Sequence, residues 1–123
     1  IRLCKGSYTG TRSVTLIRPH DVDLRMAACL RALMTGPSTV MLASHDPVFV
    51  ALGEQLMASL DRQLEFQMLQ GIRPLEQRRL VDIGHRMRVY LPYGHDWYRY
   101  CTRRIVERPG NIWLFGRSLV ERR

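Results

Sequence analysis

Two adjacent arginines near the C-terminal end of the chain are the best candidates for binding a charged ligand. Residues Tyr100 to Glu107 read Tyr-Cys-Thr-Arg-Arg-Ile-Val-Glu, so on a helix Arg103 and Arg104 both lie within four residues of Tyr100 and of Glu107. Two neighbouring guanidinium groups can hold a carboxylate through paired hydrogen bonds, and Glu107 can fix the orientation of one of them. Two further tyrosines are predicted to point toward the same place: Tyr90 and Tyr93. An ordinary helix with surface salt bridges would have the same sequence pattern.

The first residues offer a second candidate, suited to an anionic cofactor. Arg2 and Cys4 share one face of a predicted strand, and Lys5, Gly6 and Ser7 leave it as a turn of small residues. Backbone N–H groups in such a turn can approach an anion closely. Strands that end in Lys-Gly are common, so this segment predicts little by itself.

The third candidate is Ser44-His45-Asp46-Pro47, which also follows a predicted strand. Ser44 and His45 could bond a phosphate or a ribitol chain, with help from the N-terminus of the next helix. A plain helix cap with a partly exposed histidine is an equally good interpretation of these residues. A Ser/His/Asp catalytic relay is excluded, because residues adjacent at a cap do not adopt that geometry.

Other kinds of site are not indicated. The sequence contains no glycine-rich nucleotide-binding motif, no nucleophile elbow and no metal-binding histidine spacing, so no metal is expected. Cys4, Cys29 and Cys101 are odd in number and far apart, which argues against a disulfide framework or a zinc site and favours a reducing compartment.

The elements that must position these candidates alternate between short apolar runs and helical patterns. The predicted strands are residues 1–4, 39–43, 64–69 and 87–91. Helices are predicted to begin near Asp21, at Pro47 with a buried stripe of Phe49, Leu52, Leu56 and Leu60, at Pro74, and at Asp96. A last helix is predicted around residues 113–119.

Short connections between strands and helices predict parallel strands joined by right-handed crossovers. The third and fourth strands each have one polar face, carrying Glu65 and Gln67 in one strand and Arg88 and Tyr90 in the other. A polar face suits the interior of a barrel near a ligand better than a sheet covered on both sides. We therefore predict an α/β fold, half of a (β/α)8 barrel with about four strand–helix units plus a C-terminal helix. Half a barrel has two open edges, so we expect residues 1–123 to be part of a longer domain.

Composition leaves one alternative function. The apolar fraction of 46% and the charged fraction of 24% are typical of a globular domain. The net charge of +8 would also suit a basic, non-catalytic binding module for nucleic acid or anionic lipid. No aromatic residues interleave with a basic stripe, and most arginines fall on the exteriors or ends of predicted helices. We therefore do not expect nucleic acid binding.

Five motifs taken together resemble the proline dehydrogenase family, most closely its short monofunctional bacterial enzymes. They are Arg-Leu-Cys-Lys-Gly-Ser-Tyr, Ser-His-Asp-Pro, Glu-Phe-Gln-Met-Leu-Gln-Gly-Ile-Arg-Pro, Arg-Val-Tyr-Leu-Pro-Tyr-Gly and Tyr-x-x-Arg-Arg-x-x-Glu-Arg-Pro. The resemblance implies a distorted barrel that holds FAD, oxidises L-proline to 1-pyrroline-5-carboxylate by hydride transfer to flavin N5, and passes the electrons to a membrane quinone. It also implies a cytoplasmic enzyme that can lie against the inner membrane.

The same resemblance implies a role for each matching residue. Arg2 is similar to the catalytic arginine beside flavin N5, whose charge would stabilise the negative charge gained on reduction. The cofactor-binding positions are Cys4, Lys5, Gly6, Ser7, Ser44 and His45. The positions around proline are Leu69, Tyr90, Tyr100, Arg103 and Arg104, with Glu107 supporting one of the arginines. The family's early strands, with a substrate lysine, an aspartate and a flavin-contacting glutamine, have no counterpart here, so we expect this chain alone to be inactive.

Overall fold

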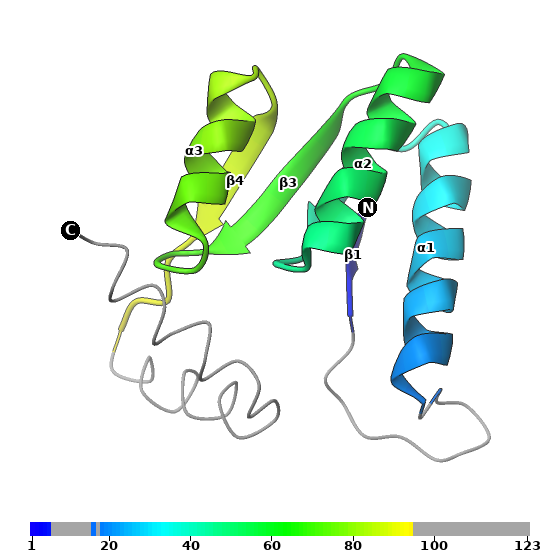
Figure 1. Ribbon diagram of the computed structural model, residues 1–123, viewed down its shortest axis with the longest axis horizontal. Helices are drawn as coiled ribbons and strands as arrows, with labels where there is room; N and C mark the ends of the chain where they lie inside the picture. The colour runs from blue at the N-terminus through cyan, green and yellow to red at the C-terminus, as the bar shows by residue number, and fades with distance from the viewer. Residues whose placement is uncertain (6–15, 17, 95–123) are drawn as a thin grey trace.

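Strands and helices alternate along the chain, as the sequence predicts. The computed structural model describes residues 1–5, 16 and 18–94 (Figure 1), so the two helices predicted beyond Tyr93 lie outside the described residues. The elements in order are β1 (Arg2–Cys4), α1 (Pro19–Thr35), β2 (Val40–Ala43), α2 (Pro47–Leu60), β3 (Leu64–Leu69), α3 (Pro74–Asp82) and β4 (Arg86–Tyr90).

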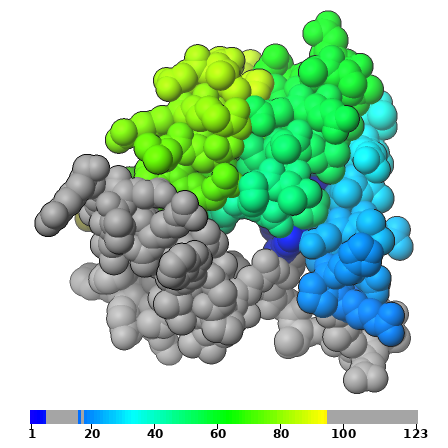
Figure 2. All heavy atoms as spheres, in the orientation of Figure 1, coloured from blue at the N-terminus to red at the C-terminus, as the bar shows by residue number. Residues whose placement is uncertain are grey.

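The four strands form one parallel sheet in the order β1-β2-β3-β4. Figure 1 shows α1, α2 and α3 on the same side of this sheet, and in the space-filling view their atoms cover most of it (Figure 2). A doubly wound sheet would reverse its strand order and carry helices on both faces. Sequential parallel strands with every crossover on one side are instead the arrangement of a (β/α)8 barrel. The described part is therefore an α/β fold consistent with part of such a barrel.

One face of the sheet forms the hydrophobic core with the helices. Strand residues alternate between faces, so Val40 and Leu42 of β2 lie on the same side as Phe66 and Met68 of β3, all at most 2% exposed. Leu3 of β1 packs against this core as well. Leu64 of β3 also belongs to this core, and the helices contribute its other members: Met26, Leu30, Met34, Phe49, Val50, Met57 and Leu80.

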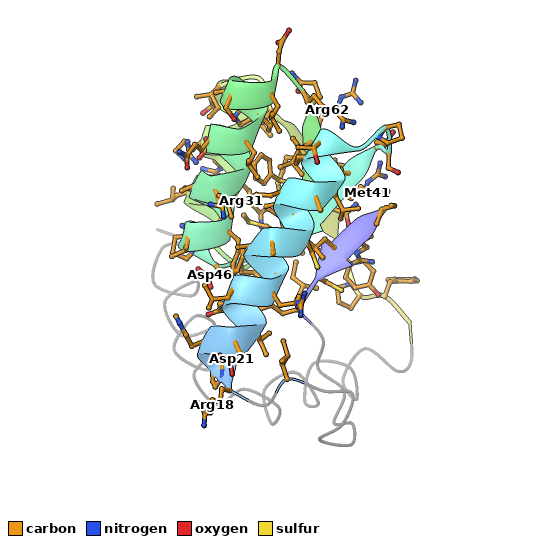
Figure 3. All side chains as sticks on the ribbon, turned by 90° about the vertical axis from the view of Figure 1, so that its right-hand side faces the viewer. Arg18, Asp21, Arg31, Met41, Asp46 and Arg62 are labelled. Atoms are coloured by element: carbon orange, nitrogen blue, oxygen red, sulfur yellow. The ribbon has the colours of Figure 1, made fainter. Side chains whose placement is uncertain are left out.

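The other face is polar, as predicted, and the strand register orders its side chains into rows. Figure 3 labels Met41, one of the residues on this face. The first row is Arg2, Met41, Glu65 and Arg86, and the second is Cys4, Ala43, Gln67 and Arg88. The third row pairs Leu69 with Tyr90. In a barrel this face lines the interior, where the resemblance placed the ligand.

Helix α1 differs from its predicted start by two residues. It begins at Pro19 rather than near Asp21, because proline fits the first helical position, where no N–H is needed. It ends at Thr35, before Gly36, as predicted. The guanidinium of Arg62, which Figure 3 shows beside the C-terminal end of this helix, donates hydrogen bonds to the carbonyl oxygens of Met34 and Gly36 and, at 2.9 Å, of Ser38. This arginine supplies donors that the last turn of a helix lacks.

The predicted stripe of α2 is confirmed in part, because Phe49 is buried and Leu52 and Leu56 pack against the core, whereas Leu60 is exposed. Leu60 is 37% exposed, and Leu52 and Leu56 are only partly buried, while Val50, Gly53 and Met57 join Phe49 in the interior. The reason is Gly53, which faces β3 so closely that an added Cβ would lie 2.8 Å from Leu64 Cδ2 and 3.1 Å from the ring of Phe66. A pattern built on large apolar residues cannot show that the closest contact is made by a glycine.

Gly53→Val is expected to destabilise the protein by about 2–3 kcal/mol, because two added methyl groups would overpack the contact with Phe66. Gly53→Ala should stay within about 1 kcal/mol of the wild type, since the Leu64 methyl group can move and alanine favours the helix. Urea unfolding of the full-length protein measures both. The matched control is Ala58→Val on the exposed side of α2. Equal losses at Gly53 and Ala58 would contradict close packing at Gly53.

Helix α3 begins at Pro74, as predicted. Strand β4 begins and ends one residue before its predicted bounds. Gly84 has a φ of +87°, which stops α3 as expected and turns the chain into β4. Arg79 of α3 bonds Glu54 of α2 at 2.9 and 3.0 Å and Glu76 at 2.7 Å, and these bonds raise the pKa of its guanidinium. The outer layer is thus joined by ion pairs between helices as well as by apolar contacts.

Candidate functional site

Most candidate residues that the structure describes lie at the C-terminal ends of the parallel strands, while Arg2 is the first residue of β1. Arg2, Cys4 and Lys5 belong to β1 and its end, while Ser44 and His45 follow β2. Leu69 and Tyr90 are the last residues of β3 and β4. The other predicted positions lie outside the described residues: Gly6, Ser7, Tyr100, Arg103, Arg104 and Glu107.

The side chain of Lys5 makes ionic and cation–π contacts within the protein. Its Nζ lies 2.6 Å from Asp23 of α1 and 3.1 Å from Asp46 before α2, and it sits 4.7 Å from the centre of the Phe49 ring. The side chain is only 16% exposed. Lys5 therefore ties β1 to the two helices, and its part in cofactor binding, still a prediction, would fall to its backbone.

The N-terminus of α2, which was predicted to help bind a phosphate, is capped by Asp46. Asp46, at the N-terminal end of α2 in Figure 3, accepts a hydrogen bond at 3.0 Å from the backbone N–H of Val48. Its carboxylate thus occupies that donor and adds a negative charge there. A phosphate at this helix end would meet a carboxylate, so the helix provides no ready anion site.

Ser44 and His45 lie beside each other at the end of β2, and each accepts a hydrogen bond from the backbone. The hydroxyl oxygen of Ser44, which is 8% exposed, accepts from the N–H of Asp46 at 3.2 Å. His45 Nε2 accepts from the N–H of Leu69 at 2.9 Å. Burial and the nearby charge of Arg73 lower the pKa of His45, so the ring is neutral near pH 7.

The loop after β3 is hydrogen-bonded to the segment that follows β2. Arg73 donates to the carbonyl oxygen of His45 at 2.9 Å, and the Gln77 side chain donates to the carbonyl oxygens of Leu69 at 3.0 Å and Ile72 at 2.7 Å. Arg73 itself has a φ of +52°, an uncommon conformation for a residue with a Cβ. The two segments predicted to contact cofactor and substrate are therefore held together by side-chain to backbone bonds.

A polar network on the interior face was not predicted as part of the site. The guanidinium of Arg88 on β4 donates to both carboxylate oxygens of Glu65 on β3, at 2.6 and 3.0 Å, and the Gln67 amide donates to the same carboxylate at 2.6 Å. Arg88, followed by Gln67, lowers the pKa of Glu65 from 4.5 to about 2. The alternation of polar residues in both strands was the signal that could have led to this pairing.

Glu65→Gln is expected to lower stability near pH 7 and to matter less in acid. A folded-state pKa below the unfolded value makes the carboxylate stabilising above about pH 4.5, and the contribution disappears as the pH falls toward 2. The difference in unfolding free energy between wild type and variant should shrink by roughly half or more between pH 7 and pH 3. Urea unfolding at the two pH values measures it, and a difference that is independent of pH would contradict the pairing with Arg88.

The tyrosines at the end of β4 are accessible. Tyr90 is 46% exposed, and Tyr93 is 96% exposed among the described residues. The carbonyl oxygen of Tyr90 accepts a hydrogen bond at 2.9 Å from the N–H of Gln70, and Tyr90 is opposite Leu69 in the strand register. Leu69 and Tyr90 thus form an apolar and aromatic pair at the edge of the polar face.

The residues present fit a flavin. Cys4 and Ala43 are neighbours on the interior face, and their small side chains leave room there for a flat ring. Arg2, in the row below, provides a positive charge, and Ser44 follows Ala43 at the end of β2. By contrast, no group of three His, Cys, Asp or Glu residues within the described ranges is arranged to hold a metal ion.

Four arginines in the described part of the chain are bonded within the protein. Arg62 and Arg73 donate to backbone carbonyl groups, whereas Arg79 and Arg88 bond carboxylates. These arginines stabilise the fold or line the interior face, so no observation favours the basic binding module. No helix within the described residues has the length and hydrophobicity needed to cross a membrane.

Comparison with known proteins agrees with the motifs. A family model described as "Proline dehydrogenase" matches residues 1–111. "Proline dehydrogenase 1" of Bacillus subtilis (strain 168) is 40% identical over 125 residues, which cover 99% of this chain and 41% of that protein. "Proline dehydrogenase 2" of the same strain is 39% identical over 115 residues, covering 91% and 38%.

A bacterium of another genus also has a similar protein. "Proline dehydrogenase" of Deinococcus radiodurans is 36% identical over 121 residues, which cover 90% of this chain and 37% of that protein. The chain therefore spans about two fifths of the length of the curated relatives it matches.

Proposed function

We propose, since this chain belongs to the proline dehydrogenase family, that it forms part of an FAD and L-proline site that oxidises proline to 1-pyrroline-5-carboxylate. A bound FAD would supply the acceptor, at N5, for the hydride that leaves proline. The described residues would then contribute charge, hydrogen bonds and an apolar wall around the two ligands.

One observation carries the proposal: every candidate residue falls inside the segment that matches the family. The match covers residues 1–111, and it includes β1 with Arg2, the end of β2 with Ser44 and His45, and the end of β4 with Tyr90. The ends of β2 and β4 lie at the same end of one parallel sheet, which supports the proposal because barrel enzymes bind their substrates there.

Each candidate residue of this chain would have a role that follows from its side-chain chemistry. Arg2 would provide positive charge near the flavin ring, and Ser44 with His45 would bond oxygen atoms of the cofactor. Leu69, Tyr90 and Tyr100 would contact the apolar ring of proline. Arg103 and Arg104 would bind its carboxylate, with Glu107 holding one guanidinium in place.

Several properties of the whole protein are further parts of this proposal. We propose that residues 1–123 belong to one barrel domain, whose other strands would complete the pocket. We also propose that a membrane quinone accepts the electrons, and that the enzyme works in the cytoplasm, peripheral to the inner membrane. A sheet whose edge strands are β1 and β4 in the described part supports the first of these points.

The test uses the full-length protein that carries this chain. Purified protein should show the visible absorption of bound flavin, and the absorption should bleach when L-proline is added without oxygen. The product should react with a reagent that captures cyclic imines. D-proline, with its carboxylate on the other side of the ring, serves as the matched control. A protein with bound flavin that L-proline fails to reduce would overturn the proposed activity.

A further inference from the structure

The side chains at the end of β2 share an unusual hydrogen-bonding state. Ser44 Oγ accepts from the N–H of Asp46 at 3.2 Å, and His45 Nε2 accepts from the N–H of Leu69 at 2.9 Å. Both partners are backbone N–H groups, which can donate but never accept. The acceptor capacity of these two adjacent side chains is therefore used, wholly or in part, by the protein itself.

For His45 this bond decides where the ring hydrogen lies. A neutral imidazole carries one hydrogen, on either Nδ1 or Nε2, and the nitrogen without it is the acceptor. Hydrogen on Nε2 would face the hydrogen of Leu69 N–H at a separation of 2.9 Å between the nitrogens. The contact is a hydrogen bond only when Nε2 is bare, so the hydrogen must be on Nδ1.

We infer that Leu69 fixes His45 as the neutral Nδ1–H tautomer, which makes the Ser44–His45 pair a hydrogen-bond donor to an oxygen atom of the ligand. Among the described residues, His45 Nδ1 has no hydrogen-bond partner of its own. The Ser44 hydroxyl likewise keeps its hydrogen available. The identification of that ligand as a flavin rests on the proposed function, whereas the tautomer does not.

The charges around His45 support the neutral form. Arg73 donates to the carbonyl oxygen of His45, and its charge together with burial lowers the pKa of the ring. The carboxylate of the neighbouring Asp46 is already paired with Lys5 at 3.1 Å. An imidazolium would lose the Leu69 bond and face the positive charge of Arg73.

The ligand chemistry follows from the donors. Two neutral donors suit an oxygen acceptor, either a hydroxyl of the ribityl chain or a phosphate oxygen of FAD. They add no net charge, and the carboxylate of Asp46 occupies the nearby helix end. His45 also links two functions, because the N–H that fixes its ring belongs to Leu69, the proposed wall for proline.

The first test needs no variant. Full-length protein with nitrogen-15 in its histidine rings should show, at pH 7, the long-range pattern of a bare Nε2 and a protonated Nδ1 for His45. The signals, assigned with a His45→Asn sample, should keep this pattern to a lower pH than those of an ordinary histidine, because burial and Arg73 lower the pKa of the ring. A protonated Nε2, or a fully protonated ring at pH 7, would overturn the inference even in an active enzyme.

The second test separates the two ring nitrogens. His45→Leu removes both, while His45→Asn keeps an amide donor near the place of Nδ1 and loses the acceptor for Leu69. Hydrogen exchange at the Leu69 amide should become faster in both variants. Flavin affinity should fall about five- to tenfold in His45→Leu, the cost of one neutral hydrogen bond, and about twofold or less in His45→Asn.

A comparison of the affinities for riboflavin, FMN and FAD identifies the ligand atom that accepts the hydrogen bond from His45. Equal losses for all three in His45→Leu would place it on the ribityl chain, and a loss limited to FMN and FAD would place it on a phosphate. Unchanged affinity for all three, in a protein that binds flavin, would overturn the donor role. A wild-type protein that binds no flavin but has the predicted tautomer would refute the proposed cofactor and leave the ring assignment intact.

Discussion

Replacing Arg2 with methionine in the full-length protein is expected to lower kcat for proline oxidation by about 100- to 1000-fold, the cost of losing one group that stabilises developing charge. Arg2 is on the polar face of β1, because Leu3 between it and Cys4 packs against the core. Its side chain is therefore on the interior side of the sheet. Methionine keeps much of the length of the stem and removes the guanidinium, so the strand itself should be little affected.

The flavin gives a readout for Arg2 that does not depend on turnover. Loss of the positive charge should shift the reduction potential of the bound flavin to more negative values, while the flavin content stays near that of the wild type. The matched control is Arg25→Met on the exposed side of α1, which should change neither quantity. A slow Arg2→Met enzyme with an unchanged potential would mean that the arginine acts on the fold and not on the flavin.

The features that the sequence predicted well are those that depend on the short-range pattern of a strand. Side chains alternate between faces with a period of two residues, so Glu65 and Gln67 had to oppose Phe66 and Met68 once β3 was recognised. The proline at Pro47 and the glycine at Gly84 marked element ends for local steric reasons. These choices are made within a few residues of the chain.

The errors arose where the outcome depends on contacts between distant elements. The face that α2 turns to the sheet is selected by the close approach of Gly53 to Leu64 and Phe66, and a search for large apolar residues passes over glycine. The partners of the Lys5 side chain, Asp23 and Asp46, come from two other elements and were not predicted. Ionic partners far apart in sequence leave no periodic signal.

The candidate site shows the same limit. Sequence reasoning could choose Ser44 and His45 as polar residues after a strand, but it left open whether they bind a ligand or only cap a helix. The hydrogen bond that orients the ring of His45 comes from the backbone N–H of Leu69, and a backbone N–H has no sequence signature. The Glu65–Arg88 pair likewise depends on which strands are neighbours. Residue type and face were predictable, whereas hydrogen-bond partners required the fold.

Arg104→Met in the full-length protein is expected to lower kcat/KM for L-proline by about 30- to 1000-fold, which corresponds to about 2–4 kcal/mol. Arg104 lies outside the described residues, so this prediction comes from its spacing in the sequence and from the family resemblance. Arg103 and Arg104 would share the carboxylate of proline, and every proline analogue that this site accepts carries that group. Removing one guanidinium would leave the carboxylate with half of its paired hydrogen bonds in a partly desolvated pocket.

The carboxylate contact can be separated from a general effect on the enzyme. Flavin content should change little in Arg104→Met, because the proposed cofactor contacts come from β1 and the end of β2. A competitive inhibitor with a carboxylate should lose affinity with the substrate, whereas a neutral ring of the same size should bind as before. Arg108→Met, four residues further on, is the matched control and should retain near wild-type kcat/KM. Loss of flavin with unchanged proline kinetics in the remaining holoenzyme would show that this pair of arginines serves the cofactor and not the substrate.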